Sequence, residues 1–346
     1  MPSLKMDAPQ GKTELVSRWT LDAGDYIAAA ELSRDGRLCI VGAGDGAVLG
    51  IDVDTGREVF RHVAHPGGVL AVSMAPEGTQ FATSGQQPNA KIWKATGELL
   101  RELPGGGSQW VDHVAWAPSG GRIATAAGRT VRVWNADGEP LLETEPLPST
   151  VSNIAWRADG TALAATCYGG VYIWPFVADA KVRRFEWKGS LISLAWSPDA
   201  KVIACGSQDS SVHFWRLATG QDSEMSGFPF KPKALAWDSE SKLLATSGDA
   251  TVTVWDFRGK GPEGKRPIQL ESHKSVCTRL AFSRRKCVLA SGSQDSSVLL
   301  WEPRRTAQPV RYAFLEDEVT ALAWHPEHQG LLGGDASGNL RFWEVS

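Results

Sequence analysis

Three residues of one short stretch of the chain carry the side chains of a hydrolytic triad. His273, Ser291 and Asp295 supply an imidazole, a hydroxyl and a carboxylate, the groups with which a nucleophilic hydrolase works. The sequence offers no further paired carboxylates, activated Cys/His pair or metal-ligand cluster specific enough to define an active site. We therefore predict that the protein is not an enzyme, that it has no catalytic residues, and that it needs neither a cofactor nor a metal.

Two shorter motifs resemble ligand-binding sites, but the residues around them do not fit such a site. The segment GKGPEGKR within residues 258–267 resembles a phosphate-binding loop, but Arg266 stands where a Ser or Thr would hold Mg²⁺. Such a loop also needs a preceding strand and a following helix N-terminus, and none is indicated here. His325 and His328 have a metal-like spacing without a third ligand nearby, so we interpret them as part of a solvated turn.

Composition excludes several classes of protein. The 36 Lys and Arg residues nearly balance the 39 Asp and Glu residues, so we predict no nucleic-acid partner that would depend on bulk positive charge. No apolar run is long enough to cross a membrane, and we predict no membrane partner. Five cysteines lie within apolar runs and never as CxxC, which is typical of buried reduced thiols and predicts a cytoplasmic protein.

The positions that must hold these side chains belong to a repeat. Short apolar strands end in Trp at intervals of 40 to 46 residues, and Ile51 takes the same place upstream. These strands end at Trp93, Trp134, Trp174, Trp215, Trp255, Trp301 and Trp343. A second column precedes a turn in each unit, and it consists of Leu32, Met74, Trp116, Trp156, Trp196, Trp237, Phe282 and Trp324. The residue before this column is Glu31 in the first unit and Ser or Ala in the others.

Each unit has the pattern of four short strands separated by turns rich in Gly, Asp, Ser and Pro. No stretch has a sustained helical period, so the sequence predicts an all-β fold. Four strands every 40 to 46 residues indicate the blades of a single β-propeller. We count eight blades, with seven as the alternative because Ile51 replaces Trp in the first unit.

These features resemble the WD40-repeat family over nearly the whole chain. Trp255-Asp256 is a literal WD pair, and the segment GSQDSSV occurs twice, at 206–212 and 292–298. The resemblance implies that His273, Ser291, Asp295 and Trp301 form the buried structural tetrad of the family. On this interpretation the Ser291 hydroxyl stabilises a blade and does not face a substrate. Other units keep only parts of the tetrad, and Cys205 stands where the fifth would have Ser.

The ends of the chain predict how the ring closes. The last unit stops three residues after Trp343 and lacks a fourth strand, which would leave an open edge. Residues 13–21 have a strand-like pattern and belong to no other unit. We predict that they complete the last blade, that residues 13–346 form the propeller, and that residues 1–12 are a flexible tail.

The resemblance also indicates where a partner would bind. In the family the first residues of each innermost strand lie at the upper face of the ring, beside the channel. Trp110 and Tyr26 occupy such positions, and aromatic side chains are common binding anchors. The other candidates at this rim are Asp112, His113, Lys231, Lys233, Arg279 and Glu318.

The resemblance favours one function over another. We predict a non-catalytic scaffold that binds one or more proteins or peptides through this upper face, as a monomeric propeller within a complex. An enzyme or small-ligand-binding propeller that uses the channel mouth is the alternative. Trp110 could also cap the core under its own Gly-rich loop.

Overall fold

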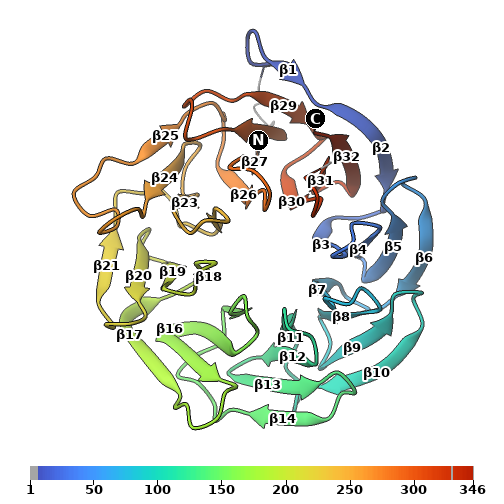
Figure 1. The fold of residues 1–346 in the computed structure, drawn as a ribbon. Helices are drawn as coiled ribbons and strands as arrows, with labels where there is room; N and C mark the ends of the chain where they lie inside the picture. The colour runs from blue at the N-terminus through green and yellow to red at the C-terminus, as the bar shows by residue number, and fades with distance from the viewer. Residues whose placement is uncertain (1–6, 329, 346) are drawn as a thin grey trace.

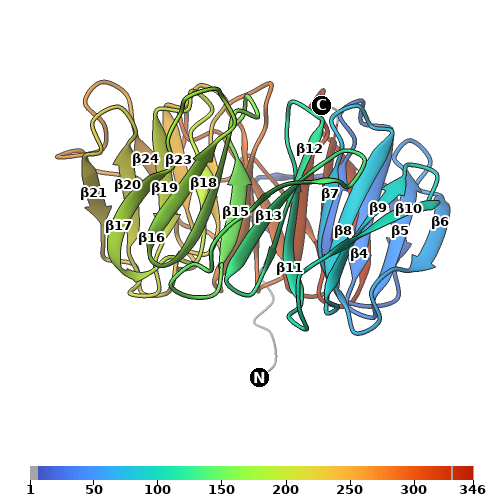
Figure 2. The same ribbon diagram turned by 90° about the horizontal axis from the view of Figure 1, so that it is seen from below.

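The chain forms a ring of eight β-sheets around a central channel (Figure 1). The computed structural model describes residues 7–328 and 330–345, and in that range it contains strands and no helix. The prediction of an all-β propeller with eight blades is therefore confirmed. Successive blades follow one another around the ring, and each has its first strand at the channel (Figures 1 and 2).

The first four blades come from residues 27–190. Blade 1 consists of β3 (Ile27–Leu32), β4 (Leu38–Ala43), β5 (Ala47–Asp52) and β6 (Glu58–Val63). Blade 2 consists of β7 (Val69–Met74), β8 (Gln80–Gly85), β9 (Asn89–Lys94) and β10 (Leu99–Pro104). Blade 3 consists of β11 (Val111–Trp116), β12 (Arg122–Ala127), β13 (Thr130–Asn135) and β14 (Pro140–Glu143). Blade 4 consists of β15 (Asn153–Trp156), β16 (Ala162–Pro175) and β17 (Arg183–Ser190). Strand β16 continues through Gly169 and Gly170, both at positive φ, and stands in place of a second and a third strand.

The remaining blades use the rest of the chain and its N-terminal strands. Blade 5 consists of β18 (Ala195–Trp196), β19 (Val202–Gly206), β20 (Val212–Arg216) and β21 (Asp222–Met225). Blade 6 consists of β22 (Leu235–Trp237), β23 (Leu243–Thr246), β24 (Val252–Asp256) and β25 (Ile268–Leu270). Blade 7 consists of β26 (Cys277–Phe282), β27 (Leu289–Ser293), β28 (Ser297–Trp301) and β29 (Arg311–Phe314), with β1 (Thr13–Glu14) added at its edge. Blade 8 consists of β30 (Val319–Trp324), β31 (Gly330–Asp335), β32 (Asn339–Glu344) and β2 (Val16–Asp22).

The N-terminal strand closes the ring, as predicted. Strand β2 pairs antiparallel with β32, from Val16 opposite Glu344 to Asp22 opposite Asn339. The boundary differs from the expected 13–21, because Thr13 and Glu14 instead pair in parallel with β29 of blade 7. The N-terminus thus covers the outer edges of two neighbouring blades. Residues 1–6 of the predicted tail lie outside the described residues.

The core lies between the blades, which explains the apolar runs in the sequence. One buried cluster joins Val41 and Leu49 of blade 1 to Leu332 and Phe342 of blade 8. Both faces of a blade are buried in this way, so strict alternation of polar and apolar residues is not required. The described residues contain no helix that is long and apolar enough to span a membrane.

Candidate functional site

The innermost strands define the two faces of the ring. We call the face at which these strands begin the upper face, and the face at which they end the lower face. The innermost strand of blade 3 runs for six residues from Val111 to Trp116. At about 3.3 Å per residue such a strand spans roughly 20 Å, so its two ends belong to separate surfaces.

The two predicted aromatic anchors lie on loops of the upper face. The side chain of Trp110 is 50% exposed and that of Tyr26 is 40% exposed. Half of the Trp110 surface is therefore accessible to solvent. Tyr26 precedes β3 of blade 1 and Trp110 precedes β11 of blade 3, so blade 2 separates them.

The predicted polar residues are spread around the upper rim and form no single cluster. In blade 3 burial raises the pKa of Asp112 and lowers the pKa of His113. Lys231 precedes blade 6 and donates from Nζ to Oε1 of Gln208 at 3.0 Å. Lys233 lies two residues further along the same loop and is exposed. In blade 7, Nη1 of Arg279 donates to the Thr278 carbonyl at 3.0 Å. Glu318 precedes the first strand of blade 8 and is half-buried. With Tyr26 and Trp110, these residues occupy five of the eight blades.

The structure adds two aromatic side chains to the upper face that the sequence analysis missed. Tyr168, in the turn of β16, and Phe230, in the loop before β22, are each 54% exposed. The available signal was an aromatic residue inside a turn, in CYGG and in FPFKPK. The face therefore presents four exposed aromatic side chains, on blades 1, 3, 4 and 6.

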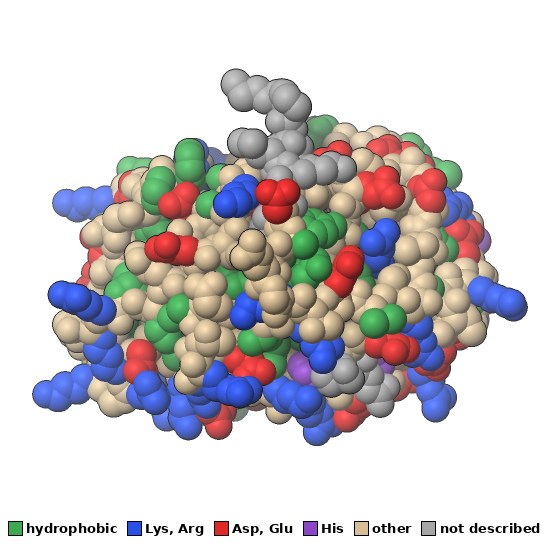
Figure 3. Space-filling view, turned by 90° about the horizontal axis from the view of Figure 1, so that it is seen from above, with side chains coloured by type: hydrophobic (Ala, Val, Ile, Leu, Met, Phe, Trp, Pro, Cys, Tyr) green, Lys and Arg blue, Asp and Glu red, His purple; other side chains and the backbone are tan. Residues whose placement is uncertain are grey.

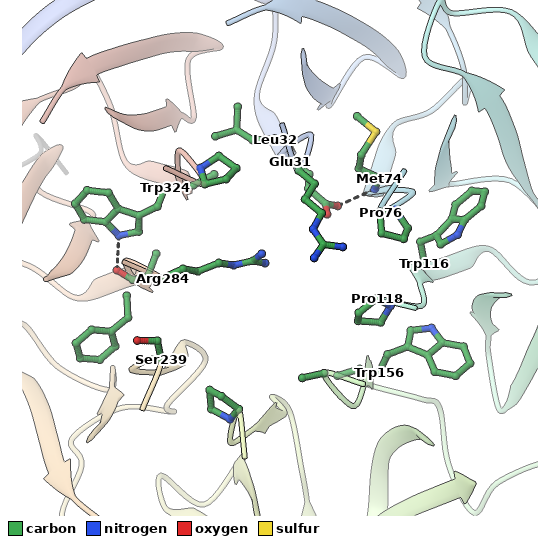
Figure 4. A pocket seen from close by; sticks show the side chains of 18 of the residues that line it. Glu31, Leu32, Met74, Pro76, Trp116, Pro118, Trp156, Ser239, Arg284 and Trp324 are labelled. Atoms are coloured by element: carbon green, nitrogen blue, oxygen red, sulfur yellow. Dashed lines mark hydrogen bonds between the residues drawn. The ribbon is translucent and has the colours of Figure 1, made fainter. Parts of the chain in front are cut away.

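A cavity of about 810 Å³ opens at the lower end of the channel (Figure 4). It is lined by the last residues of the innermost strands and the turns after them, among them Glu31, Arg34, Trp116, Trp156, Arg284 and Trp324. Oε2 of Glu31 accepts a hydrogen bond from the Met74 amide at 3.0 Å. Burial between blades raises the pKa of Glu31 to about 7, although hydrogen bonds and Arg284 act in the opposite direction. This cavity lies on the face opposite to the predicted anchors.

The triad-like residues form a closed network inside blade 7. The Ser291 hydroxyl lies 2.7 Å from Nε2 of His273 and accepts a hydrogen bond from Nε1 of Trp301 at 2.8 Å. Ser291 and Asp295 have no exposed surface. A hydroxyl held in this way cannot meet a substrate, so the geometry serves stability.

The insert 258–267 and the pair His325 and His328 are held by contacts within the fold. The insert 258–267 connects β24 and β25, and Arg216 of blade 5 anchors it through a 2.8 Å ion pair with Glu263. His328 is buried with Nδ1 2.6 Å from the Ser283 hydroxyl, whereas His325 lies against Gly36. Among the described residues no group of three or more His, Cys, Asp or Glu could hold a metal ion.

Comparison with known families agrees with this geometry. The family described as the IFT122 first beta-propeller matches residues 27–265, and the WD domain, G-beta repeat matches residues 264–302 and 311–344. The chain belongs to the WD40-repeat β-propeller family. The WD40 resemblance of the sequence is thereby confirmed.

Several curated WD40 relatives are similar over part of their length. Protein FIZZY-RELATED 1 of Arabidopsis thaliana is 29% identical over 200 residues, 56% of this chain and 41% of the relative. WD repeat-containing protein slp1 of Schizosaccharomyces pombe is 26% identical over 234 residues, 65% of this chain and 47% of the relative. The WDS homolog of Arabidopsis thaliana is 24% identical over 301 residues, 81% of this chain and 56% of the relative. The chain spans about half the length of the curated relatives it matches.

A solved structure supports the fold alone. The computationally designed Ika8 protein has a TM-score of 0.80 and 23% sequence identity, and the match covers 96% of this chain and 100% of the designed one. At that identity the likeness carries no functional information.

In blade 7 a fifth residue, Ser297, bonds to the WD40 tetrad, and the sequence analysis missed it. The Ser297 hydroxyl lies 2.7 Å from Nδ1 of His273 and donates to Oδ1 of Asp295 at 2.5 Å, while His273 and Asp295 stay 3.7 Å apart. Burial alone would raise the pKa of Asp295, but the electrostatic attraction of His273 and the hydrogen bonds from Ser297 and the Lys274 amide hold this pKa well below its usual range.

Blade 2 has a partial version of the same WD40 network. Thr83 lies 2.8 Å from Nε2 of His65 and accepts from Nε1 of Trp93 at 2.9 Å. Nδ1 of His65 is buried without a hydrogen-bond partner among the described residues. Burial and the nearby Lys91 lower the pKa of His65 to about 4. The signal in the sequence was Thr83 ten residues before Trp93, the spacing of Ser291 and Trp301.

Proposed function

We propose that this WD40 propeller is a non-catalytic scaffold that binds a protein partner through its upper face. The observation that carries the proposal is the exposure of Tyr26, Trp110, Tyr168 and Phe230 on one face of the ring. Exposed aromatic side chains on a rigid framework lose little conformational freedom on binding and supply most of the contact energy. The partner is a protein or peptide, and the propeller acts as a monomer within a cytoplasmic complex without a nucleic-acid or membrane partner.

Charge on the upper face supports the proposal. Acidic residues occupy the two loops on either side of the 336–338 turn, where blade 8 meets blade 1. They are Asp22, Asp25, Glu316, Asp317 and Glu318. Lys231 and Lys233 lie in blade 6 and Arg279 in blade 7, so the face is polarised. A partner with complementary charge would be oriented by this pattern, since charges at a rim affect association rate more than affinity.

The test compares proteins captured by matched variants. The tagged wild type, a Trp110→Ala/Tyr26→Ala variant and a Lys260→Ala/Arg266→Ala variant are purified from the native cell, and bound proteins are quantified by mass spectrometry. Truncation of a central aromatic anchor costs about 2–4 kcal/mol of binding. We expect specific partners to be lost from the upper-face variant alone, with all three proteins melting at the same temperature. Partners lost from the lower-face insert variant and kept by the upper-face variant would refute the proposal.

The alternative function is ligand binding at the channel mouth. The lower cavity and the perturbed carboxyl of Glu31 are the observations that favour it. Shifted carboxyl groups in a cleft are common at ligand sites and also occur in purely structural networks. The two functions use opposite faces of the ring, so a substitution that tests one of them should leave the other unchanged.

A further inference from the structure

The lower mouth of the channel departs from the repeat at one half-buried position. The residue before the end of the innermost strand is Ser73 in blade 2 and Ala in blades 3 to 8, but it is Glu31 in blade 1. One oxygen of the Glu31 carboxyl is tied to the Met74 amide, and the side chain lines the cavity. The ring does not need a carboxyl group at this position for stability, because six blades have Ala at it.

Two arginines, from turns of blades 1 and 7 on either side of blade 8, line the same cavity. Arg34 follows β3 of blade 1 and Arg284 follows β26 of blade 7, and Arg284 reaches across the opening toward the side on which Glu31 lies (Figure 4). Neither arginine forms a hydrogen bond or salt bridge with a described residue. Nearby arginines of this face are neutralised, Arg285 by Glu327 at 2.6 Å and Arg304 by Asp238 at 2.8 Å. Two guanidinium groups are thus left to face the channel.

The surroundings of these arginines are apolar and the rim is basic. Trp116, Trp156, Pro76 and Pro118 line the wall of the cavity. On the side of the ring formed by blades 7 and 8, Lys and Arg side chains gather along the lower edge of the view (Figure 3). The lower-face turns of blade 7 contain Arg284, Arg285, Lys286, Arg304 and Arg305, of which Arg285, Arg304 and Arg305 are paired with carboxylates. This combination fits a ligand that carries a negative charge next to apolar groups.

We propose that the lower mouth of the channel binds an acidic, partly apolar peptide segment of a partner protein, whose carboxylate is held by Arg34 and Arg284 and receives a hydrogen bond from Glu31. Arginine suits the task because its planar fork matches a carboxylate. The volume of about 810 Å³ admits a short peptide stretch. The site lies on the opposite face from the aromatic anchors and does not depend on the upper-face proposal.

The role of Glu31 makes binding depend on pH. Its carboxyl donates a hydrogen bond only when protonated, and burial holds its pKa at about 7. The other groups that face it come from its own blade (Arg34 and Cys39), from blade 2 (Ser73 and the Met74 amide), from blade 7 (Arg284) and from blade 8 (His325). Burial raises the pKa of the Cys39 thiol and lowers that of His325, so neither gains charge between pH 7 and 8. Binding should weaken about tenfold from pH 6 to pH 8 as the Glu31 proton is lost.

The experiment measures fluorescence anisotropy of a short fluorescein-labelled peptide of alternating leucine and glutamate. A matched peptide with glutamine in place of glutamate controls for apolar contacts. We expect Arg34→Ala and Arg284→Ala each to weaken binding about 10- to 150-fold, the range of one charge-assisted hydrogen bond. Arg266→Ala removes the same charge from the lower-face insert and should bind as the wild type does. Glu31→Gln, which donates at every pH, should abolish the pH dependence and keep the affinity seen at pH 6.

Several results would overturn this inference. They are failure of the glutamate peptide to bind, equal binding of the glutamine peptide, or wild-type affinity in both arginine variants. Saturable, arginine-dependent binding of citrate alone would identify a site for a small carboxylate and exclude the peptide. Loss of peptide binding in the Trp110→Ala/Tyr26→Ala variant would move the site to the upper face. None of these results decides the capture experiment on the upper face.

Discussion

Neighbouring blades are joined at the channel in two different ways. At four of the eight junctions between blades, the indole of the last residue of an innermost strand donates to the carbonyl of an alanine in the blade before it. Trp156 bonds to Ala115 at 3.0 Å, Trp196 to Ala155 at 3.0 Å, Trp237 to Ala195 at 3.4 Å and Trp324 to Ala281 at 2.8 Å. We call these contacts the indole joints.

Blades 1 to 3 are joined in the reverse sense. Side-chain oxygens of Glu31 and Ser73 accept hydrogen bonds from the backbone amides of Met74 and Trp116, at 3.0 and 2.9 Å. The indole Nε1 of Trp116 is then buried without a partner among the described residues. We call these contacts the side-chain joints.

The contrast shows that neighbouring innermost strands can be joined by different groups, and that the group present decides whether the joint responds to pH. An indole joint contains no group that titrates near neutral pH, whereas the joint at Glu31 does. Blade 2, which lies within the side-chain joints, also has the incomplete histidine network with the unpaired Nδ1 of His65. The joint at Glu31 should therefore respond to pH near neutrality, and the indole joints should not.

Removal of the closing strand should have the largest effect, because both kinds of joint require a closed ring. Deletion of residues 1–22 removes β2, including Trp19, whose Nε1 donates to the Val53 carbonyl at 2.7 Å. The exposed edge of β32 would then favour aggregation. We expect a strongly lowered melting temperature or insoluble protein. Deletion of residues 1–12 keeps β1 and β2 and should melt near the wild type; an equal loss in both deletions would argue against closure by β2.

The histidine networks of blades 2 and 7 allow the stability of the two blades to be compared. His273→Ala in blade 7 leaves the buried Ser291 and Ser297 hydroxyls short of a partner and should cost about 1–3 kcal/mol in the free energy of unfolding. His65→Ala in blade 2 affects only Thr83, so it should cost less. Urea denaturation of both variants measures the difference. Similar losses would show that the additional partners of His273 contribute nothing.

The pH dependence of stability should distinguish the joint at Glu31. Its pKa is raised from 4.5 to about 7 on folding, so the folded state binds the proton more tightly, and stability falls as the pH rises from 4.5 through 7. Glu31→Gln removes this loss and should stabilise the protein by about 1–2 kcal/mol at pH 8, after allowance for the channel-facing part of the group. At pH 5 the variant and the wild type should be nearly equal. Equal stability of the two at pH 8 would contradict the shift.

A smaller effect is expected from two matched tryptophan substitutions. Trp196→Phe removes the indole N–H of a joint and leaves the Ala155 carbonyl unpaired, which should cost about 0.5–1.5 kcal/mol beyond the loss of ring area. Trp116→Phe removes an N–H that has no partner among the described residues, so only the loss of ring area should remain. Thermal denaturation of the two variants gives the difference. A larger loss for Trp116→Phe would mean that the indole joints add no stability.

The candidate site could be predicted only in part. Their position at the start of the innermost strands indicated Tyr26 and Trp110, and both are exposed. Tyr168 and Phe230 were missed because a turn aromatic in a single sequence looks like any other loop residue. The cavity of the lower mouth was missed because Arg34 and Arg284 are 250 residues apart, and ring closure alone brings them to one opening.

The sequence by itself determined the repeat, the all-β propeller with eight blades, and the strand that closes it. These follow from local signals, since strand and turn patterns recur at a fixed spacing and an unpaired edge needs a partner. Only the tertiary structure decided how each joint between blades is made, which aromatic side chains remain exposed, and that the carboxyl of Glu31 shares a cavity with two arginines. The physical reason is that burial and the approach of distant charges depend on neighbours in space, which the order of residues does not specify.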